Sequence, residues 1–216
     1  MEMYRAMHGR FGHQAWWPGE TRLEICVGAI LTQNTNWSNV KKAIANLIAA
    51  NCLDVACLHA MGIEQLAELI RPAGYYNIKA RRLKNFIARV HEHAADDIDA
   101  FLDRPAGALR EDLLSINGLG RETADSIVLY AAGKPTFVID AYTCRIMFRH
   151  HLISPEDDYE AVKDLFESHL PCDVELWNDY HAQLVAVGKE FCRPKARCEG
   201  CPLEQFPHDP QAGSEY

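Results

Sequence analysis

Apolar residues recur at helical spacing along most of this chain, and no segment shows the strict alternation of a half-buried strand. Between residues 38 and 50 the apolar positions follow i, i+3, i+4 spacing, which predicts an amphipathic helix. The run LEICVGAIL at 23–31 is almost wholly apolar and predicts a helix buried on all sides. Similar patterns predict helices at 54–60, 63–70, 78–94, 98–103, 107–115, 121–132, 142–151, 158–169 and 174–190. The fold is therefore expected to be all-α.

The Gly-Lys-Pro sequence at 133–135 interrupts this pattern and separates two groups of helices. We expect a six-helix lobe over residues 22–132. A second helical lobe would combine the N-terminal segment, 1–21, which has little periodicity, with residues 133–201. Residues 202–216 would then form a tail.

Composition places the chain among globular proteins. It has 48% apolar and 24% charged residues, and its apolar runs are far too short to span a membrane. The N-terminus lacks the apolar core of a signal peptide, so we expect a cytoplasmic protein without a membrane partner. The net charge of −8 argues against extensive coating of nucleic acid.

One stretch departs from this acidic character. From Leu69 to His91 there is no Asp or Glu, and the six basic residues are Arg71, Lys79, Arg81, Arg82, Lys84 and Arg89. A local basic stripe of this kind can bind a phosphate backbone with one face of the protein, or it can be an ordinary solvated helix face. The charges alone favour neither interpretation.

Five of the eight cysteines are scattered along the chain, at Cys26, Cys52, Cys57, Cys144 and Cys172. Most have apolar neighbours, which predicts small buried hydrophobic side chains in a reducing compartment. The other three, near the C-terminus, form a separate group.

The stretch from Leu114 to Asp140 carries two candidate chemical features. Asn117-Gly118-Leu119-Gly120 lies between two helical runs, where glycines suit a tight turn with positive φ whose N–H groups can converge on an anion. A Gly-x-Gly sequence is also often only a turn. Asp140 follows the apolar run Phe137-Val138-Ile139, as a positioned carboxylate or as the N-cap of a helix beginning near Ala141.

Several motifs in order resemble the endonuclease III superfamily of helix-hairpin-helix DNA glycosylases. The matching segments, within a resemblance that covers roughly residues 22–201, are Leu31-Thr32-Gln33-Asn34-Thr35, Gly74-Tyr75-Tyr76-Asn77-Ile78-Lys79-Ala80, Ile116 to Ala124, and Val138-Ile139-Asp140. The resemblance implies a two-lobed glycosylase fold, with the helix-hairpin-helix at about 107–132. It also implies a monomer acting in base-excision repair on double-stranded DNA that contains a damaged base.

The resemblance assigns roles to individual residues. The hairpin Asn117, Gly118, Leu119 and Gly120, with Arg121 after it, would hold a DNA phosphate. Asp140 would face the sugar of a flipped nucleotide and stabilise an oxocarbenium-like centre as the N-glycosidic bond breaks. Gln33 would fill the vacated space, and Tyr75, where a leucine wedge is usual, would stack into the opposite strand.

One position departs from the bifunctional members of this superfamily. They carry a lysine two residues after the second hairpin glycine, where it forms a Schiff base with the sugar, whereas this chain has Glu122. A carboxylate cannot form that imine. The expected enzyme is therefore a monofunctional glycosylase without AP lyase activity, in which Glu122 complements the dipole of the helix that it begins.

Three tryptophans suggest the substrate. Trp16-Trp17-Pro18, Trp37 and Glu122 make the sequence most similar to the 3-methyladenine DNA glycosylases of this superfamily. A methylated purine is a flat cation, which aromatic faces attract by about 0.5–2 kcal/mol per contact. The alternative for Trp16, Trp17 and Trp37 is packing in the core.

The remaining cysteines match most of a cluster motif. Endonuclease III relatives end in four cysteines that bind a [4Fe-4S] cluster, and Cys192, Cys198 and Cys201 keep three of them in nearly that spacing. Pro207 replaces the fourth, with His208 beside it. We expect a [4Fe-4S] cluster with His208 as the fourth ligand or with one iron open, while zinc or an empty loop are the alternatives.

Two other functions remain open. An endonuclease III-like glycosylase for oxidised or mispaired bases would keep the chemistry and change the base. A non-catalytic DNA-binding module would use the hairpin and the cluster for structure or damage sensing. The two classes differ in what Asp140 does, because only an enzyme needs its carboxylate for base release.

Overall fold

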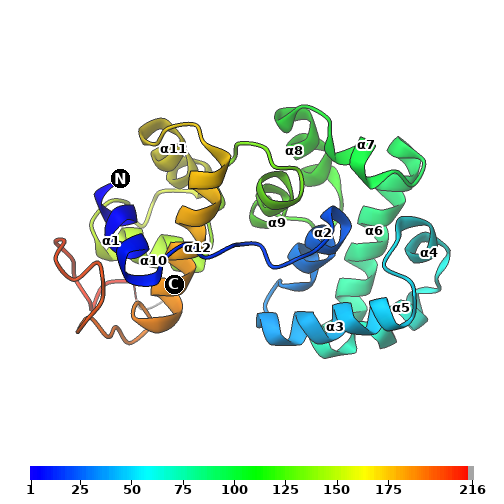
Figure 1. Cartoon of the computed structure of the whole chain (residues 1–216), viewed down its shortest axis with the longest axis horizontal. Coiled ribbons are helices and arrows are strands. Elements are labelled where there is room, and N and C mark those ends of the chain that lie inside the picture. The colour runs from blue at the N-terminus through cyan, green and yellow to red at the C-terminus, as the bar shows by residue number, and fades with distance from the viewer. Residues whose placement is uncertain (214–216) are drawn as a thin grey trace. The chain divides into compact units, whose positions relative to one another are not determined.

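The computed structural model describes residues 1–213, and within that range the chain forms helices and no strand (Figure 1). The predicted all-α class is confirmed. No helix in this range is both long and apolar enough to cross a membrane.

The chain divides into two compact units, which are described separately. The first comprises Met1–Trp16 together with the chain from Pro135 onward, and the second comprises Trp17–Lys134. The second junction lies at the predicted Gly-Lys-Pro interruption. The first falls between the adjacent residues Trp16 and Trp17, so the middle unit is continuous and the terminal unit is assembled from two segments.

The middle unit follows the predicted succession of helices closely. Its elements are α2 (Arg22–Leu31), α3 (Trp37–Ala49), α4 (Val55–Ala60), α5 (Ile63–Leu69), the 3-10 turn η1 (Arg71–Ala73), α6 (Tyr76–Ala94), α7 (Ile98–Leu102), α8 (Ala106–Ser115), α9 (Arg121–Ser126) and the π-helical turn η2 (Ile127–Ala131). Polar N-caps fix several starts. Thr21, Asn36 and Asp54 accept backbone N–H groups of α2, α3 and α4 respectively.

Burial agrees with the sequence pattern in this unit. Helix α2 is buried over most of its surface, as its apolar run predicts. Helix α6 buries Leu83, Phe86, Ile87 and Val90 on one face. The predicted helix at 121–132 is one continuous segment whose second half widens from α to π geometry. The hairpin between α8 and α9 is thus carried on a packed helical core.

The terminal unit contains α1 (Glu2–Phe11), α10 (Ala141–Arg149), α11 (Tyr159–His169) and α12 (Val174–Glu190). Its core forms around Phe137, which stacks on Phe166 at 4.0 Å and meets Tyr180 edge-on at 6.0 Å. Periodicity gave no indication of α1, because Met7 is the residue that this helix buries. Polar contacts hold it instead, including a hydrogen bond of 3.0 Å from the Tyr4 hydroxyl to Asp179 on α12.

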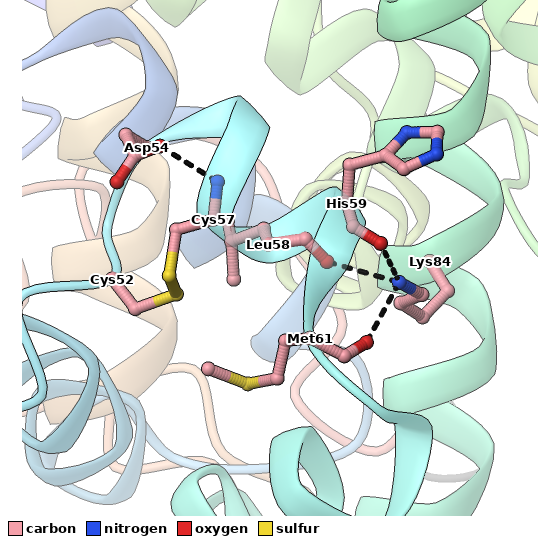
Figure 2. The surroundings of a disulfide bond; sticks show 7 residues. All are labelled: Cys52, Asp54, Cys57, Leu58, His59, Met61 and Lys84. Carbon is pink, nitrogen blue, oxygen red and sulfur yellow. Dashed lines mark hydrogen bonds between the residues drawn. A yellow bond between two sulfur atoms is a disulfide. The ribbon is translucent and has the colours of Figure 1, made fainter.

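The expectation of scattered, buried, reduced cysteines is wrong for most of the five. Cys52 and Cys57 form a disulfide across the start of α4 (Figure 2). Asp54 caps α4 between them and turns the chain so that the two Cα atoms lie 5.3 Å apart, within the range a disulfide needs. Cys172 is exposed and Cys144 is half-buried, so only Cys26 is a buried free thiol among these five.

Candidate functional site

Asp140 is the N-cap of α10, as the capping interpretation predicted. Its Oδ1 accepts the Thr143 N–H at 2.7 Å and the Thr143 hydroxyl at 2.9 Å. An aspartate at this position both satisfies a helix N–H and loses its rotational freedom. The second oxygen, Oδ2, faces a different partner.

That partner is His181, which no motif in the sequence singled out. Its Nε2 lies 3.5 Å from Asp140 Oδ2, and the two side chains are 5% and 12% exposed. Burial alone raises the pKa of the Asp140 carboxyl, but the positive charge and hydrogen bond of His181, with the bonds from Thr143, outweigh it and bring that pKa below its usual value. Asp140 is therefore a fixed and ionised carboxylate. His181 sits among apolar residues of α12. A polar side chain in that apolar run was the one sequence signal that could have pointed to a buried functional residue.

Of the two hairpin glycines, one has the expected positive φ and the other does not. Gly118 has φ +97°, and an added Cβ would overlap Arg82 Cγ, so this position requires glycine for two reasons. Gly120 has φ −93° and is the extended N-cap of α9, so the expectation of positive φ is wrong there. Leu119 packs its side chain into the core and donates its N–H to Ile116 O at 3.1 Å. Arg121 is exposed at the start of α9.

Gln33 ties the loop after α2 to this hairpin. Its Nε2 donates to the Thr123 hydroxyl at 2.8 Å and to Gly118 O at 3.4 Å, and its Oε1 accepts from Arg82. Asn85 of α6 adds a bond of 3.0 Å to Asn117 O. The amide of Gln33 is thus engaged within the protein, and the hairpin is braced by two other elements.

Tyr75 stands at the entrance to α6. Its backbone is left-handed, with φ 46°, and its side chain is 69% exposed. Behind it, the buried Lys79 donates from Nζ to Ala73 O and to Leu31 O, both at 2.8 Å. One ammonium therefore holds the turn that carries Tyr75 and the helix end that leads to Gln33. Desolvation lowers the pKa of Lys79 to about 8.

The basic stripe is neither a free phosphate-binding face nor a plain solvated one. Besides Lys79, Lys84 donates to three carbonyls at the end of α4 (Figure 2). Arg82 binds Gln33. Arg89 and Arg71 pair with Asp112 and Glu68. Most of these cations organise the middle unit itself.

The tryptophans are divided between the two units. Trp17 meets Trp37 edge-on at 5.1 Å and Tyr130 at 5.2 Å, which makes an aromatic cluster in the middle unit. Gly28 keeps the space between the indoles open, because a Cβ there would approach Trp17 Nε1 to 3.1 Å. Trp16 lies in the other unit, where Lys189 Nζ is 5.5 Å from the centroid of its ring. Tyr130 is a member of the cluster that the sequence did not suggest.

One polar atom in this cluster lacks a protein partner. The indole N–H of Trp37 is buried and forms no hydrogen bond within the part of the chain that the structure describes. A buried donor without an acceptor is costly unless something else fills the role. The cluster therefore combines three aromatic rings, in edge-on and tilted contact, with an unused donor. Glu122 is not a member of this cluster and lies exposed in the first turn of α9.

The three C-terminal cysteines line one pocket. Cys192, Cys198, Cys201 and His208 border this pocket together with Arg149. The buried Arg149 shapes this loop by donating to Arg193 O at 2.7 Å and to Pro194 O at 2.8 Å. Among the described residues, the three thiols do not belong to any group of potential ligands whose atoms all lie within 4.8 Å of one another. The donors share a pocket but are not drawn together around a single ion.

Comparison with known proteins places this geometry in context. The profile of the "HhH-GPD superfamily base excision DNA repair protein" family matches residues 27–172. A protein of Methanocaldococcus jannaschii, whose name classes it provisionally as a DNA repair glycosylase, is 47% identical over 206 residues, which cover 95% of this chain and 94% of that protein. An endonuclease III of Thermotoga maritima is 29% identical over 83% of this chain and 79% of its own length.

Solved structures agree with the family match. A Helicobacter pylori 3-methyladenine DNA glycosylase bound to 1,N6-ethenoadenine superposes with a TM-score of 0.77 and 27% identity, over 88% of this chain and 96% of that one. An endonuclease III in a non-covalent DNA complex gives a TM-score of 0.81 at 21% identity, over 98% and 93% of the two chains, which supports the fold.

Proposed function

The chain belongs to the HhH-GPD superfamily of base excision DNA repair proteins, and we propose that it is a monofunctional DNA glycosylase for cationic, alkylated purines of the 3-methyladenine type. The single observation that carries the proposal is Asp140, a carboxylate held by Thr143 and kept ionised by His181. Its preset direction suits a role in stabilising charge that develops on a substrate.

Asp140 acts on the sugar in this proposal. As the N-glycosidic bond breaks, positive charge develops at C1′, and the carboxylate stabilises it electrostatically and directs water to that carbon. The bond's electron pair leaves with the base. Because an alkylated purine already carries a positive charge, it departs as a neutral molecule and requires no general acid. An aspartate that is ionised at neutral pH is sufficient for this chemistry.

The aromatic cluster acts on the base. The faces of Trp17, Trp37 and Tyr130 attract a flat cation by stacking and cation–π terms, about 0.5–2 kcal/mol per contact. The buried Trp37 N–H supplies a donor to a purine acceptor atom. The Helicobacter pylori relative, bound to a modified adenine, supports this substrate class. The role of Trp16 in base binding stays a prediction from the sequence.

The hairpin and two loops act on the DNA. The N–H groups at the start of α9, with Arg121, hold a backbone phosphate while the damaged nucleotide is rotated out of the duplex. The exposed Tyr75 enters the stack as a wedge. Gln33 fills the vacated space by exchanging its bonds to Thr123 and Gly118 for bonds to the orphaned base.

Glu122 determines the fate of the DNA strand after base release. It has no amine, so no imine forms at this position and the abasic strand stays intact. The product is an abasic site that breaks only when alkali is added.

A [4Fe-4S] cluster in the C-terminal loop is part of the proposal. Cys192, Cys198 and Cys201 with His208 would hold it, since soft thiolates and an imidazole around one pocket suit iron and sulfide. A single zinc ion needs its ligands closer together than these thiols lie. When bound, the cluster would cross-link the loop after α12. Broad absorption at about 400 nm, with about four irons per chain, tests this assignment.

The decisive experiment compares base release from methylated, oxidised and mismatched duplexes, with and without alkali. The expected result is release from methylated DNA alone and strand breaks only after alkali. Asp140→Asn should bind the same DNA and release base at least about 100-fold more slowly, because asparagine retains the cap but not the charge. Release of oxidised or mispaired bases would show instead a glycosylase of the endonuclease III type. Negligible release by both the wild type and Asp140→Asn would show instead a non-catalytic DNA-binding module.

A further inference from the structure

Two histidines and an aspartate meet at the end of α6, and none of them belongs to the proposed glycosylase site. His59 comes from α4 and His91 from the last turns of α6, and their ring centroids are 3.9 Å apart. After α6 the backbone is left-handed at Ala95 and Asp96, with φ 47° and 70°, which turns the chain back on the helix. As a result Asp96 Oδ1 lies 2.9 Å from His91 Nδ1.

The three side chains lie near the spacing of metal ligands. One ligand atom from each lies within 4.8 Å of the other two. Two bonds of about 2.1 Å at a common ion, with an angle of about 90–110°, place neighbouring ligand atoms about 3.0–3.4 Å apart. The 2.9 Å between His91 and Asp96 is already close to that separation, so a small closing movement of His59 completes the set.

Burial gives an independent indication. Nδ1 of His59 is buried and has no hydrogen-bond partner among the described residues. The side chains of His91 and Asp96 are 47% and 32% exposed, so the cluster is open to solvent on that side. The protein thus holds two imidazoles and a carboxylate together without using all of their bonding capacity.

The position of the cluster suggests what an ion would do there. Helix α4 has six residues, too few to be stable by itself. The Cys52–Cys57 disulfide closes its start, and Lys84 of α6 donates to Leu58 O, His59 O and Met61 O at its end (Figure 2). An ion shared by His59 and His91 would add a second tie between the last turn of α4 and α6.

We propose that His59, His91 and Asp96 bind one divalent transition-metal ion, of the class of Zn²⁺ and Co²⁺, and that this ion fastens α4 to α6. Imidazole nitrogens with one carboxylate oxygen are a donor set that these ions accept, and water completes the coordination. The site lies in the middle unit, whereas the cysteine pocket belongs to the terminal unit. The proposal does not depend on the glycosylase assignment.

The test is a titration of metal-stripped full-length protein with Co²⁺ and Zn²⁺, followed by calorimetry and visible absorption. Wild type should bind one Co²⁺ with weak visible bands, independent of the intense thiolate charge-transfer bands that a cysteine site would give. His91→Gln and Asp96→Asn should weaken this binding by at least about tenfold, since outer-shell partners alone are worth 10–100-fold. His93→Gln, two residues from His91 on the same helix, is the matched control and should bind as wild type does.

A second measurement separates binding from misfolding. Zn²⁺ should raise the thermal midpoint of wild type and His93→Gln, and should not raise that of His91→Gln or Asp96→Asn, whose helical circular dichroism should match wild type. His59→Gln should behave like the other two ligand variants. Equal affinity in wild type and all three ligand variants, or Co²⁺ spectra with thiolate bands alone, would overturn the proposal.

Discussion

His181 Nε2 faces Asp140 Oδ2 across 3.5 Å, although Asp140 caps α10 and His181 lies on α12 of the same unit. Thr143 fixes the other carboxylate oxygen from within α10. Thr143 gives the carboxylate its direction, and His181 keeps it charged.

His181→Gln should therefore alter the pH dependence of base release. The charge of His181 lowers the pKa of Asp140, so its removal raises that pKa and allows the carboxyl to be protonated at a higher pH. We expect the acid limb of the rate–pH profile to move upward, with little change near pH 8. Single-turnover rates between pH 4 and 8 measure this shift. His169→Gln, an exposed histidine of the same unit, is the control, and an unshifted limb in His181→Gln would contradict the assigned role.

Gly118→Ala should destabilise the hairpin. Alanine at φ +97° is strained by about 1–2 kcal/mol, and overlap with Arg82 adds about 1–3 kcal/mol. Urea unfolding should show a loss of about 2–5 kcal/mol, together with weaker DNA binding. Gly107→Ala in α8 is the matched control, because its Cβ meets no atom within 4 Å and alanine favours a helix. Equal stability of the two variants would contradict the packing argument.

Lys79→Met should lower stability by about 2 kcal/mol or more, since Leu31 O and Ala73 O both lose a buried donor. The loss should depend on pH. With the folded pKa near 8 and the unfolded value near 10.4, the unfolded chain holds the proton longer, so wild type gains stability over the variant as pH rises through that window. Denaturation at pH 7.5 and pH 10 tests the difference. Lys42→Met on the exposed face of α3 should show neither effect.

Glu122→Gln should leave base release within about threefold of wild type. The side chain is exposed in the first turn of α9, where a carboxylate contributes about 0.3–1 kcal/mol through the helix dipole. Wild type should also form no covalent DNA complex when borohydride is added. A complex trapped in wild type and lost when a lysine is replaced would show that another amine performs the lyase step.

Local patterns predicted the helices well, because burial on one face leaves a period in the sequence. The α12 pattern, for example, gave the same bounds that the structure has. Contacts between distant residues leave no such period. Helix α1 depends on Tyr4 and Asp179, and the charge of Asp140 depends on His181, so neither could be inferred from local sequence. The disulfide joins cysteines only five residues apart, so its case is different: an Asp cap between two cysteines is also found at ordinary helix starts and does not by itself indicate a bond between them.

The candidate site also depends on contacts between residues that are far apart in the sequence. Asp140 and the hairpin were predictable from short motifs, whereas the partners that tune them come from other elements. Gln33 was selected for a role toward DNA, but its contacts to Thr123 and Arg82 became visible only in three dimensions. Tyr130 joined the aromatic cluster in the same way.

The assembly of the terminal unit from two segments has a consequence for synthesis on the ribosome. Residues 17–134 are all synthesised before Asp179 is added. The middle unit can therefore complete its core before α1 can pack against α12. The bonds of Tyr4 and Gln14 to Asp179 cannot form until 175 and 165 further residues, respectively, have been added. Nascent chains should therefore acquire protease resistance in two steps, first in the middle and last at both ends together.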